Sequence, residues 1–178
     1  EQEMIQSKDE LENWYSDGDP WKYFDNPQDT MRKARILSAI PQFDYEDVLD
    51  IGCGNGFLTN SLPGKQIIGI EISEKAVQWA NEHAVPNAHY LCGSLFDLPD
   101  LNLPHMDLIV ITGVLYPQYI AESIRLVYIL IDQLLKPGGI LVCSHIYEWY
   151  KARFPYLTVS REYFAYREYS QVLEVYCK

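Results

Sequence analysis

The order of apolar segments constrains the fold of this chain more than any other feature of the sequence. Five short apolar runs, each of strand length, lie between turn residues and stretches with helical spacing. They occupy residues 47–51, 66–72, 88–92, 106–112 and 140–145. Strands that alternate with helices at this spacing are joined by right-handed crossovers, which makes them parallel. The pattern therefore predicts an α/β fold with helices on both faces of a mostly parallel sheet.

The C-terminal part of the chain breaks this alternation. Two runs of alternating apolar residues, 163–168 and 171–177, are separated only by Tyr169 and Ser170. A link this short joins neighbouring strands only as an antiparallel hairpin. We therefore expect an antiparallel hairpin at the end of the parallel sheet.

Helical spacing occurs before the first strand and between the later ones. The expected helices lie at residues 4–15, 29–40 and 119–135, with further helix starts after the first and second strands. Asp29 and Ser73 are suited to cap two of these helices. The chain of 178 residues is expected to be one domain, with a core formed by residues 46–178. The helices of residues 1–45 can fold over a substrate site as a lid.

The charge balance disfavours nucleic acid as a partner. The chain has 14 basic and 25 acidic residues, so its net charge of −11 repels phosphate backbones. The basic cluster of Arg32, Lys33 and Arg35 is interpreted as the solvated face of a helix. No run of about 18 apolar residues and no signal-peptide pattern is present, which predicts a cytoplasmic protein without a membrane partner.

The four cysteines show no pairing or metal-ligand pattern. Cys53, Cys92, Cys143 and Cys177 are widely spaced, without a CxxC pair. We expect free, mostly buried thiols and no metal site.

Three glycines follow the first strand, in the segment LDIGCGNGF. In an open parallel sheet the ligand lies beyond the carboxyl ends of the strands, where Gly52, Gly54 and Gly56 would stand. The dinucleotide fingerprint requires a further glycine at position 57, which is occupied by Phe57. This spacing disfavours NAD without excluding it. Glu71, at the end of the second strand, is suitably placed to bind a ribose diol, so we expect an adenosine-like ligand.

Five segments in register carry a family resemblance: VLDIGCGNG, IGIEIS, GSLFDLP, MDLIVITGVLY and LLKPGGILV. Together they resemble the class I S-adenosylmethionine-dependent methyltransferases over residues 48–142. The resemblance implies a Rossmann-like, seven-stranded sheet whose last two strands are the terminal hairpin. It also implies S-adenosylmethionine as methyl donor and S-adenosylhomocysteine as product.

The resemblance places the donor against the loops that follow the first four strands. The implied donor-binding residues are Asp50, Gly52, Cys53, Gly54, Gly56, Glu71, Ile72, Ser94, Leu95, Thr112 and Gly113. Glu71 would hold the ribose hydroxyls, and Ile72 would pack on the adenine. Many relatives have aspartate where Ser94 stands, so Asp97 is an alternative partner for the adenine amino group.

A narrower resemblance concerns the acceptor. DGDPWKYF, MRKARILSAIP and VLYP are similar to segments of the nodulation protein S family, which N-methylates the free amino sugar of a chitooligosaccharide precursor. The similarity weakens after His145. An amino sugar or another small polar metabolite is therefore the expected acceptor, bound by a monomer or homodimer. The absence of an NPPY-type motif and of acidic ligands after the fourth strand disfavours DNA-amine and catechol substrates.

An amine acceptor must lose a proton to a group within hydrogen-bond reach. The candidate catalytic residues are His145, Tyr116 and Glu148, near the ends of the fourth and fifth strands. The candidate substrate-binding residues are Asp19, Trp21, Tyr119 and Tyr147. Two alternatives remain open: a protein that holds the adenosyl ligand without turnover, and an NAD-dependent oxidoreductase.

Overall fold

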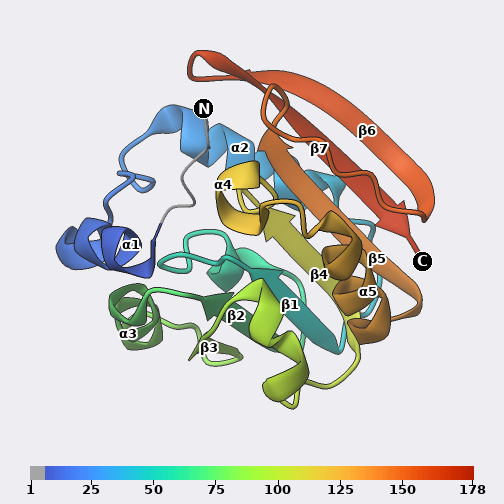
Figure 1. Ribbon diagram of the computed structural model, residues 1–178, viewed down its shortest axis with the longest axis horizontal. Helices are drawn as coiled ribbons and strands as arrows, with labels where there is room; N and C mark the ends of the chain where they lie inside the picture. The colour runs from blue at the N-terminus through green and yellow to red at the C-terminus, as the bar shows by residue number, and fades with distance from the viewer. Residues whose placement is uncertain (1–6) are drawn as a thin grey trace.

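The computed structural model describes residues 7–178, which form one seven-stranded sheet in the order β3-β2-β1-β4-β5-β7-β6 (Figure 1). The strands are β1 Asp47–Ile51, β2 Gln66–Glu71, β3 Ala88–Cys92, β4 Met106–Thr112, β5 Leu135–Ile146, β6 Leu157–Tyr166 and β7 Tyr169–Cys177. β1 to β5 pair in parallel, whereas β7 runs antiparallel between β5 and β6. This confirms the predicted α/β fold and its antiparallel hairpin.

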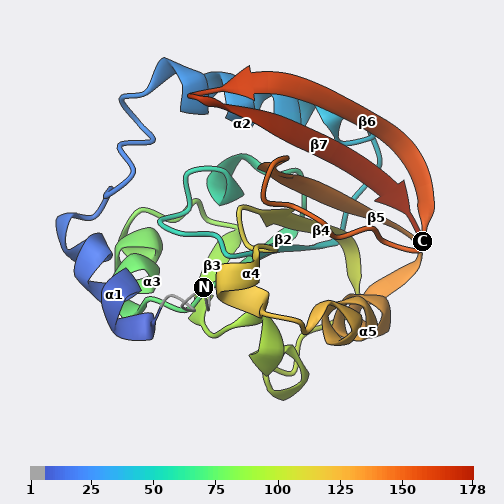
Figure 2. The same ribbon diagram turned by 45° about the horizontal axis from the view of Figure 1, so that its top comes forward.

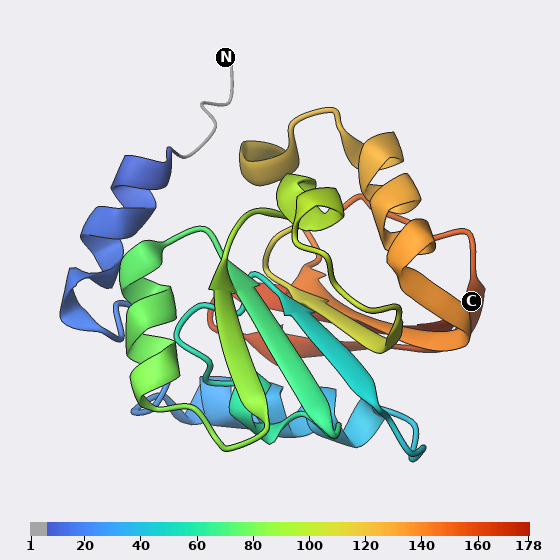
Figure 3. The ribbon, with the colours of Figure 1, turned by 90° about the horizontal axis from the view of Figure 1, so that it is seen from below.

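Helices cover both faces of this sheet. They are α1 Lys8–Trp14, α2 Pro27–Ala39, α3 Glu74–Glu82, α4 Pro117–Ile120 and α5 Ile124–Leu134. α2 lies on one face, whereas α4 and α5 lie on the other (Figures 2 and 3). None of the helices between residues 7 and 178 is long and apolar enough to cross a bilayer.

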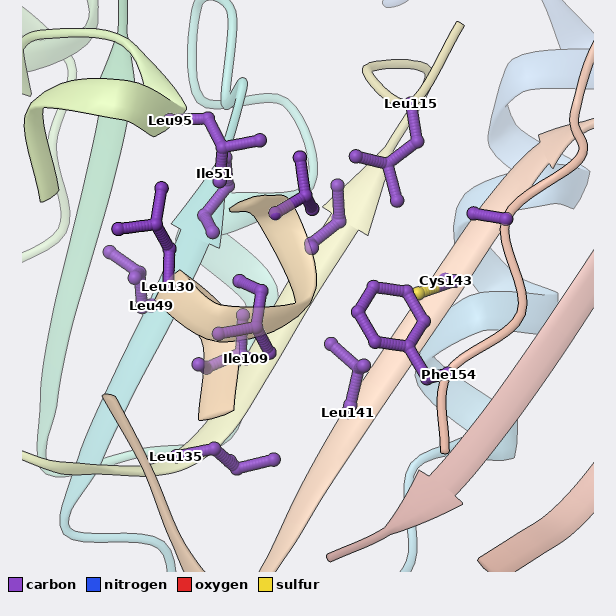
Figure 4. Close-up of a cluster of buried hydrophobic side chains, with 14 of the residues drawn as sticks. Leu49, Ile51, Leu95, Ile109, Leu115, Leu130, Leu135, Leu141, Cys143 and Phe154 are labelled. Carbon is purple, nitrogen blue, oxygen red and sulfur yellow. The ribbon is translucent and has the colours of Figure 1, made fainter. Parts of the chain in front are cut away.

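Two apolar cores follow from this layering, because successive residues of a strand point to opposite faces. Val48 packs with Ile36 of α2, whereas the neighbouring Leu49 belongs to the core under α5. Figure 4 shows part of the second core, where Leu49, Ile109 and Leu130 gather as α5 crosses the sheet. The strands β1 and β4 are therefore mostly apolar; their polar positions are Asp47, Asp50, Asp107 and Thr112.

Three expected helices differ from those observed. The helix expected after the glycines is absent; residues 57–62 form turns and a single 3-10 turn, because Pro63 follows too soon for a full helix. The helix expected at 119–135 is broken at Ala121, whose φ of 47° ends α4. α2 is capped by Asn26, whose side chain accepts the Gln28 amide at 2.9 Å, and not by Asp29. The expected Ser73 cap of α3 is confirmed.

The hairpin turn also lies elsewhere than expected. Tyr166 pairs with Tyr169, so the turn consists of Arg167 and Glu168, two residues before the predicted link. Arg167 has a φ of 53°, as such a tight turn requires. Residues 136–139, expected to stop a helix, form the irregular start of β5.

The cysteines are free, as predicted, but only two of them are buried. Cys53 and Cys143 are enclosed, whereas Cys92 is exposed and Cys177 is partly exposed. The first six residues, where the predicted N-terminal helix was expected to begin, lie outside the described residues.

Candidate active site

A cavity of about 600 Å³ lies at the carboxyl ends of the parallel strands, where the topology predicted a ligand. All of the expected donor-binding residues except Gly56 line it. The cavity continues past the end of β4 to the turn of the terminal hairpin. Its size suits a small-molecule ligand.

The protein's own backbone and packing require glycines in this loop. Gly52, Gly54 and Gly56 have φ values of 73°, 56° and 86°, in the left-handed region that favours glycine. A Cβ on Gly52 would lie 2.2 Å from Val114 Cγ2, and one on Gly56 would lie 2.5 Å from the Tyr90 hydroxyl. Gly56 therefore faces Tyr90 and not the cavity, so the expected donor contact of Gly56 is not supported.

Glu71 holds the glycine loop against the end of β2. Its Oε2 accepts the Gly54 amide at 3.0 Å, and its Oε1 accepts the Ile72 and Ser73 amides at 2.8 and 3.2 Å. Burial raises the pKa of Glu71, although these hydrogen bonds act in the opposite direction. Oε2 retains a lone pair on the cavity side for a ribose hydroxyl. The geometry therefore suits the role expected from the sequence.

Asp50 has an unsatisfied oxygen at the wall of the cavity. Its Oδ2 accepts the Thr59 hydroxyl at 2.7 Å, whereas Oδ1 is buried and has no hydrogen-bond partner among residues 7–178. Burial raises the pKa of Asp50 to about 7, against the Thr59 hydrogen bond and the charge of Arg32.

This pKa predicts that Asp50 destabilises the domain as pH rises. The unfolded chain releases the Asp50 proton near pH 4, whereas the folded chain keeps it until about pH 7, so stability is lost over that window. Asp50→Asn removes this titration and keeps an oxygen for Thr59. Between pH 5 and pH 8 we expect the wild type to lose roughly 2–3 kcal/mol of unfolding free energy that the variant keeps. Urea denaturation at both pH values measures this; parallel pH profiles would contradict it.

Ser94 lines the cavity, whereas Asp97 does not. Ser94 Oγ accepts the Phe96 amide at 3.1 Å, and Asp97 Oδ2 accepts the Ser94 amide at 2.7 Å. Hydrogen bonding to Ser94 lowers the pKa of Asp97, and the Asp97 carboxylate does not line the cavity. The geometry thus favours Ser94 for the contact that the sequence left open.

Three of the expected acceptor-side residues line the cavity. They are Tyr116, Tyr119 and Trp21. The Tyr116 hydroxyl accepts the Ile146 amide at 2.7 Å, which ties the end of β4 to the end of β5. Burial raises the pKa of Tyr116 to about 12, so its hydroxyl stays protonated at neutral pH.

His145 does not reach the cavity, which corrects its predicted catalytic role. The ring is fully buried, stacks on Tyr150 at 4.3 Å and accepts the Leu115 amide on Nε2 at 3.2 Å. Burial lowers the pKa of His145 to about 3, so it is neutral and structural. Its place at a strand end indicated the correct edge of the sheet but not the direction of the ring.

Glu148, Tyr147 and Asp19 also lie off the cavity. Glu148 is exposed and accepts the Ser170 amide at 3.2 Å, whereas the exposed Tyr147 ring packs on Tyr163. Asp19 accepts the Tyr23 amide at 3.1 Å and thereby orders the N-terminal segment. All three have local structural contacts, so their predicted catalytic or substrate roles are not supported by their positions.

Sequence reasoning missed the turn of the terminal hairpin and the inner side of α2. Arg167 and Glu168 line the cavity at the end where Tyr116 and Tyr119 lie, which we call the acceptor end. Arg32 also lines it, with only 12% of its side chain exposed, and the Lys33 ammonium donates to the Phe57 carbonyl at 2.7 Å. The interpretation of this cluster as a solvated face was therefore wrong for both residues. The sequence offered one signal that this helix packs against the core, namely its apolar residues Ile36, Leu37 and Ile40.

Asp29 connects the hairpin turn to α2. Its fully buried carboxylate accepts the Tyr166 hydroxyl on Oδ1 at 2.6 Å and the Arg167 guanidinium on Oδ2 at 3.0 Å. Arg32 Nε lies 3.5 Å from Oδ1. The Arg167 amide also donates to the Gln28 side chain. These contacts fix the wall at the acceptor end.

The N-terminal segment lies along the donor side of the cavity. Trp21 packs on Trp14 with ring centroids 4.7 Å apart, and Tyr23 stacks on Phe57 at 5.5 Å. Asn55 of the glycine loop donates to the Gly18 carbonyl at 3.1 Å. The segment is thus attached to the loop that would bind the donor, and its function as a lid stays a prediction.

The fold and cavity together define a Rossmann-like nucleoside site, with a strand-end carboxylate for ribose and without the third dinucleotide glycine. This is the architecture of class I S-adenosylmethionine-dependent methyltransferases. A family model described as "Methyltransferase domain" matches residues 43–173, and the chain belongs to that family. The predicted donor, S-adenosylmethionine, and the predicted enzyme class are thereby confirmed over an NAD-dependent oxidoreductase.

Relatives of known structure and sequence agree with this assignment. The N-methyltransferase NodS from Bradyrhizobium japonicum WM9, in complex with S-adenosylhomocysteine, superposes with a TM-score of 0.77 at 20% identity, over 96% of this chain and 97% of that one. This confirms the predicted resemblance at the level of the fold. The ubiquinone biosynthesis O-methyltransferase of Coxiella burnetii is 26% identical over 169 residues, which are 91% of this chain and 68% of the relative.

A third relative matches over a smaller part of its length. The biotin biosynthesis bifunctional protein BioHC of Cellvibrio japonicus is 29% identical over 113 residues, which are 60% of this chain but 21% of the relative. The chain therefore spans about a fifth of BioHC.

Proposed function

We propose that this domain transfers the methyl group of S-adenosylmethionine to the amino group of a small polar acceptor, with an amino sugar as the concrete class. The observation that carries this proposal is the composition of the acceptor end. Aromatic rings of Tyr116, Trp149 and Tyr169 surround it, and the Glu168 carboxylate lies among its lining residues. Aromatic faces and a carboxylate attract a protonated amine and pack against the apolar face of a sugar.

We also assign a partner at the donor end of the cavity to each part of the cofactor. Glu71 would bind the ribose hydroxyls, Ser94 the adenine edge, and Thr112 and Gly113 the methionyl chain beside the glycine loop. The bound cofactor supplies an electrophilic methyl group on its sulfonium. The contribution of the chain is to place an acceptor lone pair in line behind that methyl and to exclude water.

The acceptor amine must be deprotonated before it attacks. Glu168 is the carboxylate at the acceptor end of the cavity and replaces Glu148 and His145 as the candidate base. Tyr116 keeps its proton and is a candidate for a hydrogen bond that orients the acceptor. Methyl transfer needs no further acid, because the leaving thioether is neutral.

A second candidate function rests on the ubiquinone relatives, which are O-methyltransferases. The same aromatic walls accept a phenol, whose hydroxyl would need the base still more than an amine does.

An acceptor panel distinguishes these functions. S-Adenosylhomocysteine release is measured with amino sugars such as glucosamine and deacetylated chitobiose, and with dihydroxybenzoates as hydroxyl acceptors. We expect release with amino sugars, and a product whose added methyl is on nitrogen by tandem mass spectrometry. Release with the hydroxyl acceptors alone would overturn N-methylation. Donor binding in calorimetry without release for any acceptor of the panel would contradict both candidate functions.

A further inference from the structure

A nearly buried carboxamide at the wall of the cavity has an amino group without a partner. Gln171 stands near the start of β7, is only 4% exposed and lines the cavity. Its Oε1 accepts the Ser144 hydroxyl at 2.9 Å, whereas its Nε2 has no hydrogen-bond partner among residues 7–178. Polar groups with so little access to solvent are rarely left unpaired in folded proteins. A ligand in the cavity is therefore the expected partner of Nε2.

The surroundings of Gln171 fix the direction of its amino group. Ser144 is buried, does not line the cavity and holds Oε1 on its side of the carboxamide. Nε2 is not one of the fully enclosed unpaired atoms, so it is reached from the cavity. The backbone of Gln171 pairs with Ile146 of β5 and with Phe164 of β6, so the side chain starts from a rigid position. The protein thus presents a preorganised, uncharged N–H donor to the cavity.

The position of Gln171 in the sheet assigns this donor group to the acceptor side. β7 lies beyond β5 in the sheet, whereas the loops expected to bind the methyl donor follow β1 to β4 (Figure 1). Ser144 pairs with Thr112 at the end of β4, and the Gly113 amide donates to the Ser144 carbonyl at 3.0 Å. Gln171 therefore lies one strand beyond the residues that we assign to the methionyl chain. A group that it binds would be close to the methyl that is transferred.

An uncharged N–H donor selects an uncharged oxygen. A carboxylate or phosphate is bound more strongly by a charged donor, and an ammonium group has no lone pair to accept a hydrogen bond. In a 2-amino sugar, the uncharged oxygens nearest to the reacting nitrogen are the hydroxyls on the two carbons beside the amine. One of these hydroxyls is the group whose chemistry and position fit Gln171.

We propose that Gln171 is a specificity-determining residue whose Nε2 donates a hydrogen bond to the hydroxyl next to the acceptor amine. The inference rests on the proposed function, because it takes the acceptor to be an amino sugar. Ser144 is a positioning residue, since it holds the carboxamide in the required orientation. An amine without this hydroxyl would leave the Nε2 hydrogens unpaired when it binds, so the site selects amino alcohols over simple amines.

Three sugars that differ by single hydroxyls test this proposal. They are glucosamine and its 1-deoxy and 3-deoxy derivatives, each of which lacks one of the two hydroxyls beside the amine. The kcat/KM of each sugar is measured from S-adenosylhomocysteine release by wild type, Gln171→Met and Ser144→Ala. Methionine keeps the length of glutamine without an N–H donor. Gln133→Met is the matched control, because it makes the same change on the exposed side of α5, outside the cavity lining.

We expect the wild type to use one of the two derivatives about 10- to 100-fold less well than glucosamine, because that derivative lacks the bound hydroxyl. Gln171→Met should lower kcat/KM by about the same factor for glucosamine and for the other derivative, but by less than about 2-fold for the derivative without the contact. Ser144→Ala should give the same pattern with a smaller loss. Calorimetric S-adenosylhomocysteine affinity should stay within about 2-fold of the wild type in both variants. Gln133→Met should match the wild type throughout.

Three results would overturn the inference. They are an unchanged kcat/KM for glucosamine in Gln171→Met, an equal loss for all three sugars, and a loss of S-adenosylhomocysteine affinity that accounts for the loss of activity. Should Gln171→Met fail to fold, Ser144→Ala carries the same comparison. Failure of the proposed function is distinguishable, because a wild type that is inactive with all three sugars would contradict amino-sugar methylation itself.

Discussion

Gly52→Ala is expected to destabilise the domain by about 2–5 kcal/mol and to abolish measurable S-adenosylhomocysteine binding. Two effects add at this position. The new Cβ would lie 2.2 Å from Val114 Cγ2, and a φ of 73° is strained for any residue with a side chain. Relief of either effect would move the loop that lines the donor end of the cavity. Urea denaturation and calorimetric titration measure the two outcomes.

Gly113→Ala is the matched control for this substitution. Gly113 has a φ of 65°, but nothing lies within 4 Å of the position that its Cβ would take. Its substitution therefore carries the backbone cost alone, about 1–2 kcal/mol. The double variant Gly52→Ala/Val114→Ala removes the clash, since Val114 Cβ is 3.7 Å away, and should recover part of the loss. A Gly52→Ala variant no less stable than Gly113→Ala would show that the loop adapts freely.

Asp29→Ala is expected to cost about 3–5 kcal/mol of unfolding free energy, because it leaves the largely buried Arg32 guanidinium and the buried Tyr166 hydroxyl without their carboxylate. Asp29 is fully buried and accepts from both Tyr166 and Arg167. Its removal breaks the attachment of the hairpin turn to α2, so we also expect increased hydrogen exchange at the Arg167 and Glu168 amides. Thermal or urea denaturation gives the stability change.

Asp132→Ala provides the comparison with an exposed carboxylate. Asp132 pairs with Lys178 at 3.2 Å and accepts the Tyr156 hydroxyl at 2.8 Å, but its side chain is 57% exposed. Solvent screening limits such a surface pair to roughly 1 kcal/mol or less. Equal losses in the two variants would contradict the assignment of Asp29 as the buried link.

The strands and the donor side of the cavity were predictable because their signals are local. Each parallel strand is a contiguous apolar run, and each donor-binding loop directly follows its strand. Glu71 could therefore be placed from position alone, whereas Ser94 was implied only by the family resemblance, with Asp97 as an alternative. Phe57, which stands where the dinucleotide fingerprint requires a glycine, likewise distinguished this loop from an NAD-binding loop without any knowledge of the fold.

The acceptor side was not predictable in the same way. His145 and Ile146 both end β5, and nothing in the sequence tells which one faces the cavity; the fold encloses His145 between aromatic rings. The hairpin turn was misplaced because alternating residues on both sides of it allow more than one register. Arg32 was assigned to a solvated face, since the hairpin residue Tyr166, whose ring lies against its guanidinium, belongs to a distant part of the sequence.

The separation between Asp29 and Arg167 has a consequence for the order of assembly. Their contact joins residues 138 positions apart, whereas the loops at the donor end depend on neighbouring strands and short crossovers. Closing a longer loop costs more chain entropy, so contacts between nearby segments are favoured early in folding. We therefore expect the Asp29–Arg167 contact, and with it the wall beside the hairpin turn, to form later in folding than the loops at the donor end.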